Sequence, residues 1–139
     1  MQGALAELRK QFKDQIEFHH KDFPLRDLTF RAAEAARCAG TEDKVAQMRT
    51  FLFNGQRRWS TATSAINVWE KYALAAGANV EKWRSCLASQ DHRSAIEADK
   101  ALGIRMGVRA TPTIFIGKEK ISGARSFNVL AAAVRAQIK

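Results

Sequence analysis

The stretch from Gly107 to Ala124 constrains the fold most, because the helical periodicity that precedes it stops there. Thr113 to Ile116 is a short run of β-branched and aromatic residues, and Glu119 to Ser122 is a second run with strand character. The pair Gly117-Lys118 between them is typical of a tight turn, so this stretch predicts a β-hairpin. Pro112 stands directly before the first strand, where it removes no central ladder bond and favours extended geometry in the residue before it.

Helical periodicity dominates the remainder of the chain. Apolar residues recur at spacings of three and four, which predicts helices at 3–14, about 28–39, 42–53, about 61–76, from 80, from about 92 to 106, and 126–138. Between the first two of these helices, Gln15 to His20 alternates with Ile16 and Phe18 on one face. This alternation predicts a strand that closes at Pro24.

Bulk composition limits the classes of protein to consider. A chain of 139 residues with 46% hydrophobic content predicts one globular domain with a sizeable core. The net charge of +9 comes from basic residues scattered along the predicted helices, and no nucleic-acid-binding motif concentrates it, so no specific nucleic-acid partner is expected. No run of about 18 apolar residues predicts a membrane span, and no signal-peptide pattern is expected at the N-terminus.

Few residues carry a recognisable chemical pattern. Cys38 and Cys86 are too far apart for a Cys-x-x-Cys motif, and they can be buried small hydrophobes, a structural disulfide or a redox pair. The three histidines and two cysteines lack zinc-ligand spacing, so no metal is expected. Glu97 and Asp99 are interpreted as solvated helix positions. No phosphate-binding loop or hydrolase triad can be argued, and no catalytic residue or cofactor is predicted.

Several of these segments together resemble one known family. Gly107 to Ile116, the following Gly-x-x-x-Ile-Ser-Gly-Ala and the last amphipathic helix resemble the C-terminal half of DsbA-like thioredoxin-fold oxidoreductases. The alanine-rich segment before Cys38 resembles the family's helical insertion. The resemblance implies one α/β domain over residues 1–139, with a thioredoxin-like fold whose first strand is absent. The helical insertion would occupy about 27–106, between sheet-forming segments 15–24 and 113–122.

The resemblance also implies a function. Ala110, Thr111 and Pro112 match the family's substrate-binding loop, in which the Thr-Pro peptide is cis. The expected partners are cysteine-containing polypeptides or other extended peptides. The family's Cys-x-x-Cys would fall upstream of Met1, so the chain as written is expected to be inactive. The alternative is a non-catalytic peptide-binding or interaction module. The family is commonly extracytoplasmic, while the compartment of this chain stays open.

The absent strand has a further implied consequence. In the thioredoxin fold it would lie inside the sheet, between the strands matched by Gln15 to His20 and by Thr113 to Ile116. Its loss would leave rows of backbone donors and acceptors beside apolar side chains. Because open strand edges recruit other chains, self-association or strand exchange through the incomplete sheet is expected.

Overall fold

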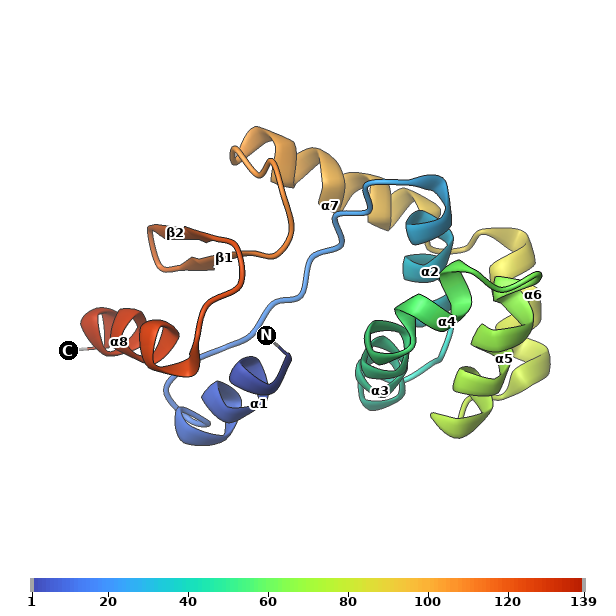
Figure 1. Ribbon diagram of the computed structural model, residues 1–139, viewed down its shortest axis with the longest axis horizontal. Coiled ribbons are helices and arrows are strands. Elements are labelled where there is room, and N and C mark those ends of the chain that lie inside the picture. Colours follow the sequence, from blue (N-terminus) through green and yellow to red (C-terminus); the bar gives the residue numbers. More distant parts are fainter. Residues whose placement is uncertain (1, 139) are drawn as a thin grey trace. The chain divides into compact units, whose positions relative to one another are not determined.

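The computed structural model describes residues 2–138 and divides them into two compact units (Figure 1). The sheet unit comprises Met1–His20 and Leu102–Lys139, and the helical unit comprises Lys21–Ala101. Within the described residues the order of elements is α1 (Gln2–Gln11), α2 (Asp27–Arg37), α3 (Glu42–Asn54), α4 (Gln56–Ser60), α5 (Ala65–Ala75), α6 (Val80–Ser89), α7 (Arg93–Arg105), β1 (Thr113–Ile116), β2 (Glu119–Ser122) and α8 (Phe127–Gln137). The boundary between the units falls within α7.

The predicted hairpin is confirmed. β1 and β2 pair antiparallel, with Thr113 opposite Ser122 and Ile116 opposite Glu119. Gly117 has a φ of 60° at the first central position of the two-residue turn, a conformation that glycine adopts at little cost. Because β1 and β2 form a two-stranded sheet, the edge of β1 that faces away from β2 carries no strand among the described residues.

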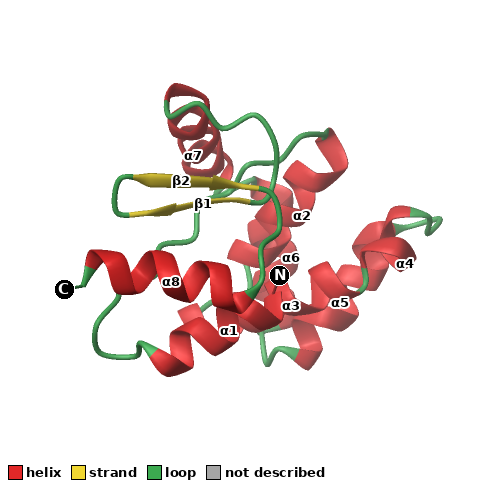
Figure 2. Cartoon of the chain, turned by 60° about the vertical axis from the view of Figure 1, so that its left-hand side comes forward, coloured by secondary structure: helices red, strands yellow, loops and turns green. Residues whose placement is uncertain are grey.

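The core of the sheet unit lies where α1, α8 and the hairpin meet. Ser126 caps α8, since its hydroxyl oxygen accepts a hydrogen bond from the Val129 N–H at 3.4 Å. α8 packs against α1 and β1, and Figure 2 shows α8 lying beside the hairpin. The buried apolar side chains come from α1 and the residue that follows it, from β2 and from α8: Leu8, Phe12, Ile121, Leu130, Ala131, Ala133 and Val134.

The prediction of a strand from Gln15 to His20, within the sheet-forming segment 15–24, is wrong. Residues 16–25 form neither helix nor strand in the structure. A strand needs a neighbour for its backbone groups, and the ladder of the described chain joins β1 and β2 to each other. The alternation still has a role, because Ile16 and Phe18 pack against the core of the sheet unit.

The core of the helical unit is built around tryptophans. Trp69 and Trp83 are both 0% exposed. Both belong to one buried cluster, most of whose residues lie on α2, α3, α5 and α6. The indole N–H of Trp83 donates to the Ala35 carbonyl at 2.8 Å, which gives a partner to a carbonyl in the last turn of α2. The indole N–H of Trp59 donates to the Leu52 carbonyl in the same way, also at 2.8 Å.

Side-chain caps set the starts of two helices in this unit. The side chains of Ser64 and Asn79 accept bonds from Asn67 N–H and Lys82 N–H, so they cap α5 and α6. The short helix α4 precedes the start predicted near residue 61 and was not anticipated. None of the helices in the described part of the chain is long and apolar enough to span a bilayer.

Candidate functional site

The loop before β1 brings together Ala110, Thr111 and Pro112 in the sheet unit. The Thr111–Pro112 peptide is cis, which confirms the expectation drawn from the resemblance. The hydroxyl of Thr113 donates to the Ala110 carbonyl at 2.7 Å, and the Gly123 N–H donates to the Pro112 carbonyl at 2.8 Å. These two bonds hold the loop to β1 and to the residue that follows β2.

The loop is accessible to solvent although it is hydrogen-bonded to the hairpin. Ala110 and Thr111 are exposed, and Pro112 is half-buried. Phe115 in the following strand keeps 37% of its surface exposed. An exposed backbone next to a strand edge can pair with an extended peptide by adding a strand to the sheet. The loop is therefore the candidate binding site of the sheet unit.

The cysteines lie elsewhere, in the helical unit. Cys38 is the residue that caps the C-terminal end of α2, and Cys86 lies in the last turn of α6. The structure joins them in a disulfide with a Cα–Cα distance of 5.7 Å. Of the three alternatives that the sequence leaves open, the bridge is the one the structure contains, and neither cysteine is free.

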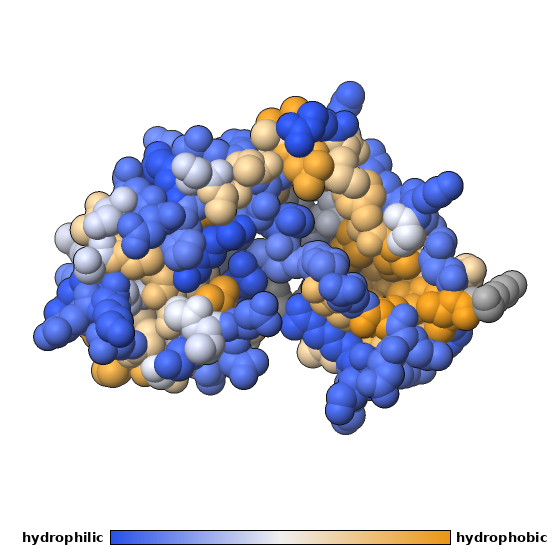
Figure 3. All heavy atoms as spheres, turned by 180° about the vertical axis from the view of Figure 1, so that it is seen from behind, coloured by the Kyte–Doolittle hydropathy of each residue, from blue (hydrophilic) through white to orange (hydrophobic). Residues whose placement is uncertain are grey.

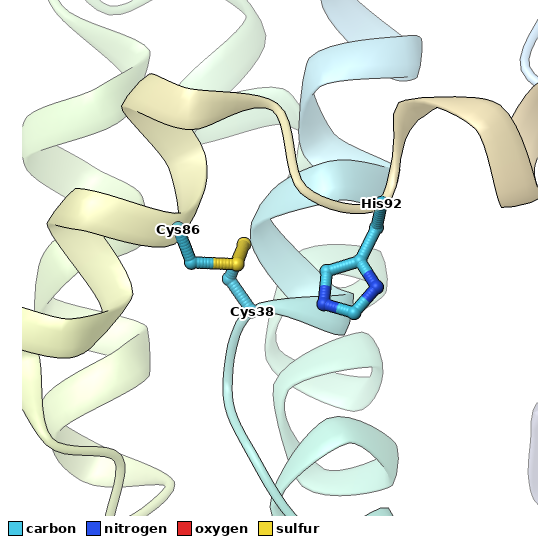
Figure 4. Close-up of side chains that lie close together, drawn as sticks. All are labelled: Cys38, Cys86 and His92. Atoms are coloured by element: carbon cyan, nitrogen blue, oxygen red, sulfur yellow. A yellow bond between two sulfur atoms is a disulfide. The ribbon is translucent and has the colours of Figure 1, made fainter.

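His92 is the residue near this disulfide that sequence reasoning missed. One of its ring nitrogens and the two sulfur atoms all lie within 4.8 Å of one another. Figure 4 shows the imidazole beside the disulfide, on the turn between α6 and α7. The structure thus brings together three residues of types that bind metal ions. They are 48 and 6 positions apart in the sequence, a spacing that does not suggest a metal site.

A left-handed turn places His92 there. Gln90 ends α6 with a φ of 54°, and the Asp91 N–H donates to the Cys86 carbonyl at 3.3 Å. The His92 carbonyl then accepts the first backbone bond of α7, from the Ile96 N–H at 3.1 Å. A glycine or asparagine at residue 90 would have signalled this turn, whereas glutamine carries no such signal.

Three carboxylates with little solvent exposure form ion pairs in the helical unit. Glu34, with a side chain only 1% exposed, accepts hydrogen bonds from Arg31 at 2.5 Å and from Arg93 at 3.2 Å. Arg37 bridges Asp22 and Asp99, with 2.7 Å to each carboxylate. The interpretation of Asp99 as a solvated helix position is therefore wrong, because its side chain is 12% exposed and ion-paired.

Comparison with known proteins identifies the family. A family model described as Thioredoxin matches residues 1–136. The chain therefore belongs to the thioredoxin family, and its fold is an α/β thioredoxin-like domain with large helical content and a small two-stranded sheet.

Curated relatives and solved structures give less information about this chain than the family model does. The chain is 30% identical over 123 residues to a protein named Na(+)/H(+) antiporter NhaA 1 from Mycolicibacterium vanbaalenii, covering 82% of this chain and 18% of the relative. It is 28% identical over 130 residues to a protein of the same name from Mycolicibacterium gilvum, covering 87% of this chain and 20% of the relative. The chain thus spans about a fifth of the length of these relatives. No solved structure gives a significant match.

Proposed function

We propose that this chain is the peptide-binding part of a DsbA-like thiol-disulfide oxidoreductase and holds cysteine-containing polypeptides in an extended conformation. The observation that carries the proposal is the exposed loop Ala110 to Pro112, fastened at the start of a strand whose outer edge carries no strand among the described residues. Membership of the thioredoxin family supports this assignment.

Thiol exchange itself requires more than this loop. The reaction proceeds by attack of a thiolate on a disulfide through a mixed-disulfide intermediate. The cysteines of these 139 residues are Cys38 and Cys86, which are bonded to each other. The loop supplies binding and orientation of the substrate, and a Cys-x-x-Cys motif in the same polypeptide would supply the attacking thiolate.

Binding at the loop has a direct test in a peptide titration followed by ¹H–¹⁵N NMR. The probe is a neutral, extended decapeptide of alternating valine and threonine with one alkylated cysteine. We expect its chemical-shift changes to centre on the amides of residues 109–116, because strand addition uses the backbone there. A peptide N-methylated at two alternate amides should bind about thirtyfold more weakly, since two hydrogen bonds are lost and each contributes roughly 1 kcal/mol.

A pair of variants gives the control within the hairpin. Thr111→Lys places a charge on the proposed binding edge, and charged edge residues oppose strand pairing. Ser122→Lys makes the same hydroxyl-to-ammonium change on β2, opposite Thr113. We expect several-fold weaker binding for Thr111→Lys alone. Equal affinity for the methylated and unmethylated peptides, or shifts outside residues 109–116, would refute binding by strand addition.

A second candidate function is a non-catalytic interaction module. It is favoured by the relatives, which are named as Na(+)/H(+) antiporters and of which this kind of domain forms 18–20%. In this function the loop would bind an extended segment of a partner or of the same polypeptide. The coding sequence before the Met1 codon distinguishes the candidates, because an in-frame Cys-x-x-Cys supports the oxidoreductase and its absence supports the module.

Self-association follows from the same open edge. Phe115 and Val129 in the sheet unit are 37% and 46% exposed, and Figure 3 shows apolar surface near the C-terminal end of α8. We expect sedimentation at micromolar concentration to give a mass that rises with concentration. Phe115→Lys should shift this equilibrium several-fold toward monomer because a charge on an edge strand opposes pairing.

The matched control for self-association is Leu74→Lys. Leu74 is 66% exposed and lies on α5 in the helical unit, whose described residues include no strand. It should leave the equilibrium unchanged. A monomer at every concentration would show that the edge of β1 does not recruit a second copy.

A further inference from the structure

We propose that Cys38, Cys86 and His92 form a binding site for a zinc-like divalent cation when the disulfide is reduced, so that the disulfide and the metal are alternative states of one cluster. This inference does not depend on the peptide-binding function proposed above. It rests on the position of the three side chains within the helical unit.

The geometry requires only small movements. The imidazole nitrogen and the two sulfur atoms lie within 4.8 Å of one another. Ligand atoms of tetrahedral zinc, with bonds of about 2.0–2.3 Å, lie about 3.5 Å apart. The Cα atoms of the cysteines are 5.7 Å apart and each residue is set by a helix end or a hydrogen-bonded turn. Side-chain rotation can therefore bring the ligands to bonding distance without a change in the helices.

The electrostatic environment favours a cation. Cys38 caps the C-terminal end of α2, and Cys86 lies in the last turn of α6. The C-terminal ends of helices carry partial negative charge, which favours a bound cation. The neighbouring cations Arg31 and Arg93 are paired with buried Glu34, one turn before Cys38, so their charge is partly offset.

The ligand set matches the chemistry of zinc sites. Two thiolates and one imidazole leave the fourth tetrahedral position for water or an exogenous ligand. Cys86 and His92 are only partly buried, so the cluster can be reached from solvent. Thiolate and imidazole together favour zinc over magnesium or calcium, which bind oxygen ligands.

The two states are linked by a balanced reaction. A dithiol gives two electrons and two protons to the Cys38–Cys86 bond, which becomes two thiols while the dithiol becomes a disulfide. The metal then displaces one proton from each thiol and binds a lone pair of the His92 imidazole. Oxidation by a disulfide reverses the sequence and releases the metal.

Cobalt(II) provides the test, because thiolate coordination gives it an intense charge-transfer absorption. The full chain is reduced with a phosphine under anaerobic conditions and titrated with Co²⁺. We expect one Co²⁺ per chain, displacement of its absorption by Zn²⁺, and no such absorption for the oxidised chain. His92→Ala should weaken binding by at least about tenfold, since it removes a ligand and not merely a supporting contact.

His19→Ala is the matched control. His19 lies in the sheet unit, pairs with Glu17 and has a side chain 66% exposed. Its removal should leave cobalt affinity unchanged. Equal affinities of the His92→Ala and wild-type chains, or no thiolate absorption in the reduced wild type, would overturn the proposal.

Circular dichroism provides a second measurement in case reduction partly unfolds the chain. A reduced chain that has lost helical signal should regain it when Zn²⁺ is added, since binding to the folded state stabilises that state. Failure of Zn²⁺ to restore the signal would overturn the proposal as well. Cys38→Ser removes one metal ligand and also prevents the disulfide, so it should show neither the cobalt absorption nor a gain of helical signal with Zn²⁺.

Discussion

Trp83→Ala is expected to lower the free energy of unfolding by about 3–5 kcal/mol. Trp83 is 0% exposed and belongs to the buried cluster of the helical unit. Truncation removes the indole ring and leaves a cavity, because the close-packed neighbours relax only in part. Urea denaturation of the full chain, followed by circular dichroism, measures the change. It is a large fraction of a typical stability of about 5–15 kcal/mol.

Two further variants separate the causes of this loss. Trp83→Phe keeps most of the apolar volume but removes the indole N–H that binds the Ala35 carbonyl at 2.8 Å. It should cost about 1–3 kcal/mol, the cost of leaving a buried acceptor unpaired. Leu74→Ala is the control, because Leu74 is 66% exposed and a surface change should stay within about 0.5 kcal/mol. A Trp83→Ala chain as stable as Leu74→Ala would contradict the assignment of Trp83 to the core.

Removing the disulfide should have an effect of similar size. Cys38 and Cys86 are separated by 48 positions, and the chain-entropy model assigns roughly 4 kcal/mol to a bridge that closes a loop of this length. We therefore expect the double variant Cys38→Ala/Cys86→Ala to lose about 2–5 kcal/mol of stability. The same denaturation experiment, with a chelator present to exclude metal binding, measures it.

Reduction of the wild-type chain supplies the independent comparison. Its stability in a phosphine reductant with chelator should fall to that of the double variant, whose own stability should not respond to the reductant. A double variant that unfolds at the same urea concentration as the oxidised wild type would show that the bridge does not stabilise the fold.

The elements with strong local signals were predictable from the sequence. The hairpin has the bounds expected of it, because β-branched strands and a glycine turn are local properties. α8 begins after the Ser126 cap for the same reason. The loop Ala110 to Pro112 could be proposed as a site because its position before β1 matches a family motif.

Pairing between distant segments could not be predicted in the same way. The alternation of Gln15 to His20 is typical of a strand, but a strand exists only where a neighbour accepts its hydrogen bonds. The structure offers none to residues 16–25, which form no strand and instead contribute Ile16 and Phe18 to packing. Asp99 is a similar case, because only tertiary contact with Arg37 removes it from solvent.

The sequence by itself therefore determined the hairpin, most of the helices and the chemical character of the loop before β1, since each depends on residues a few positions apart. Only the tertiary structure decided that Cys38 and Cys86 are bonded and that His92 lies within 4.8 Å of them. Helix packing sets the distance between Cys38 and Cys86, and the left-handed conformation of Gln90 sets the position of His92. Neither is encoded in spacing along the chain, because contacts of long sequence separation form through the burial of a shared core.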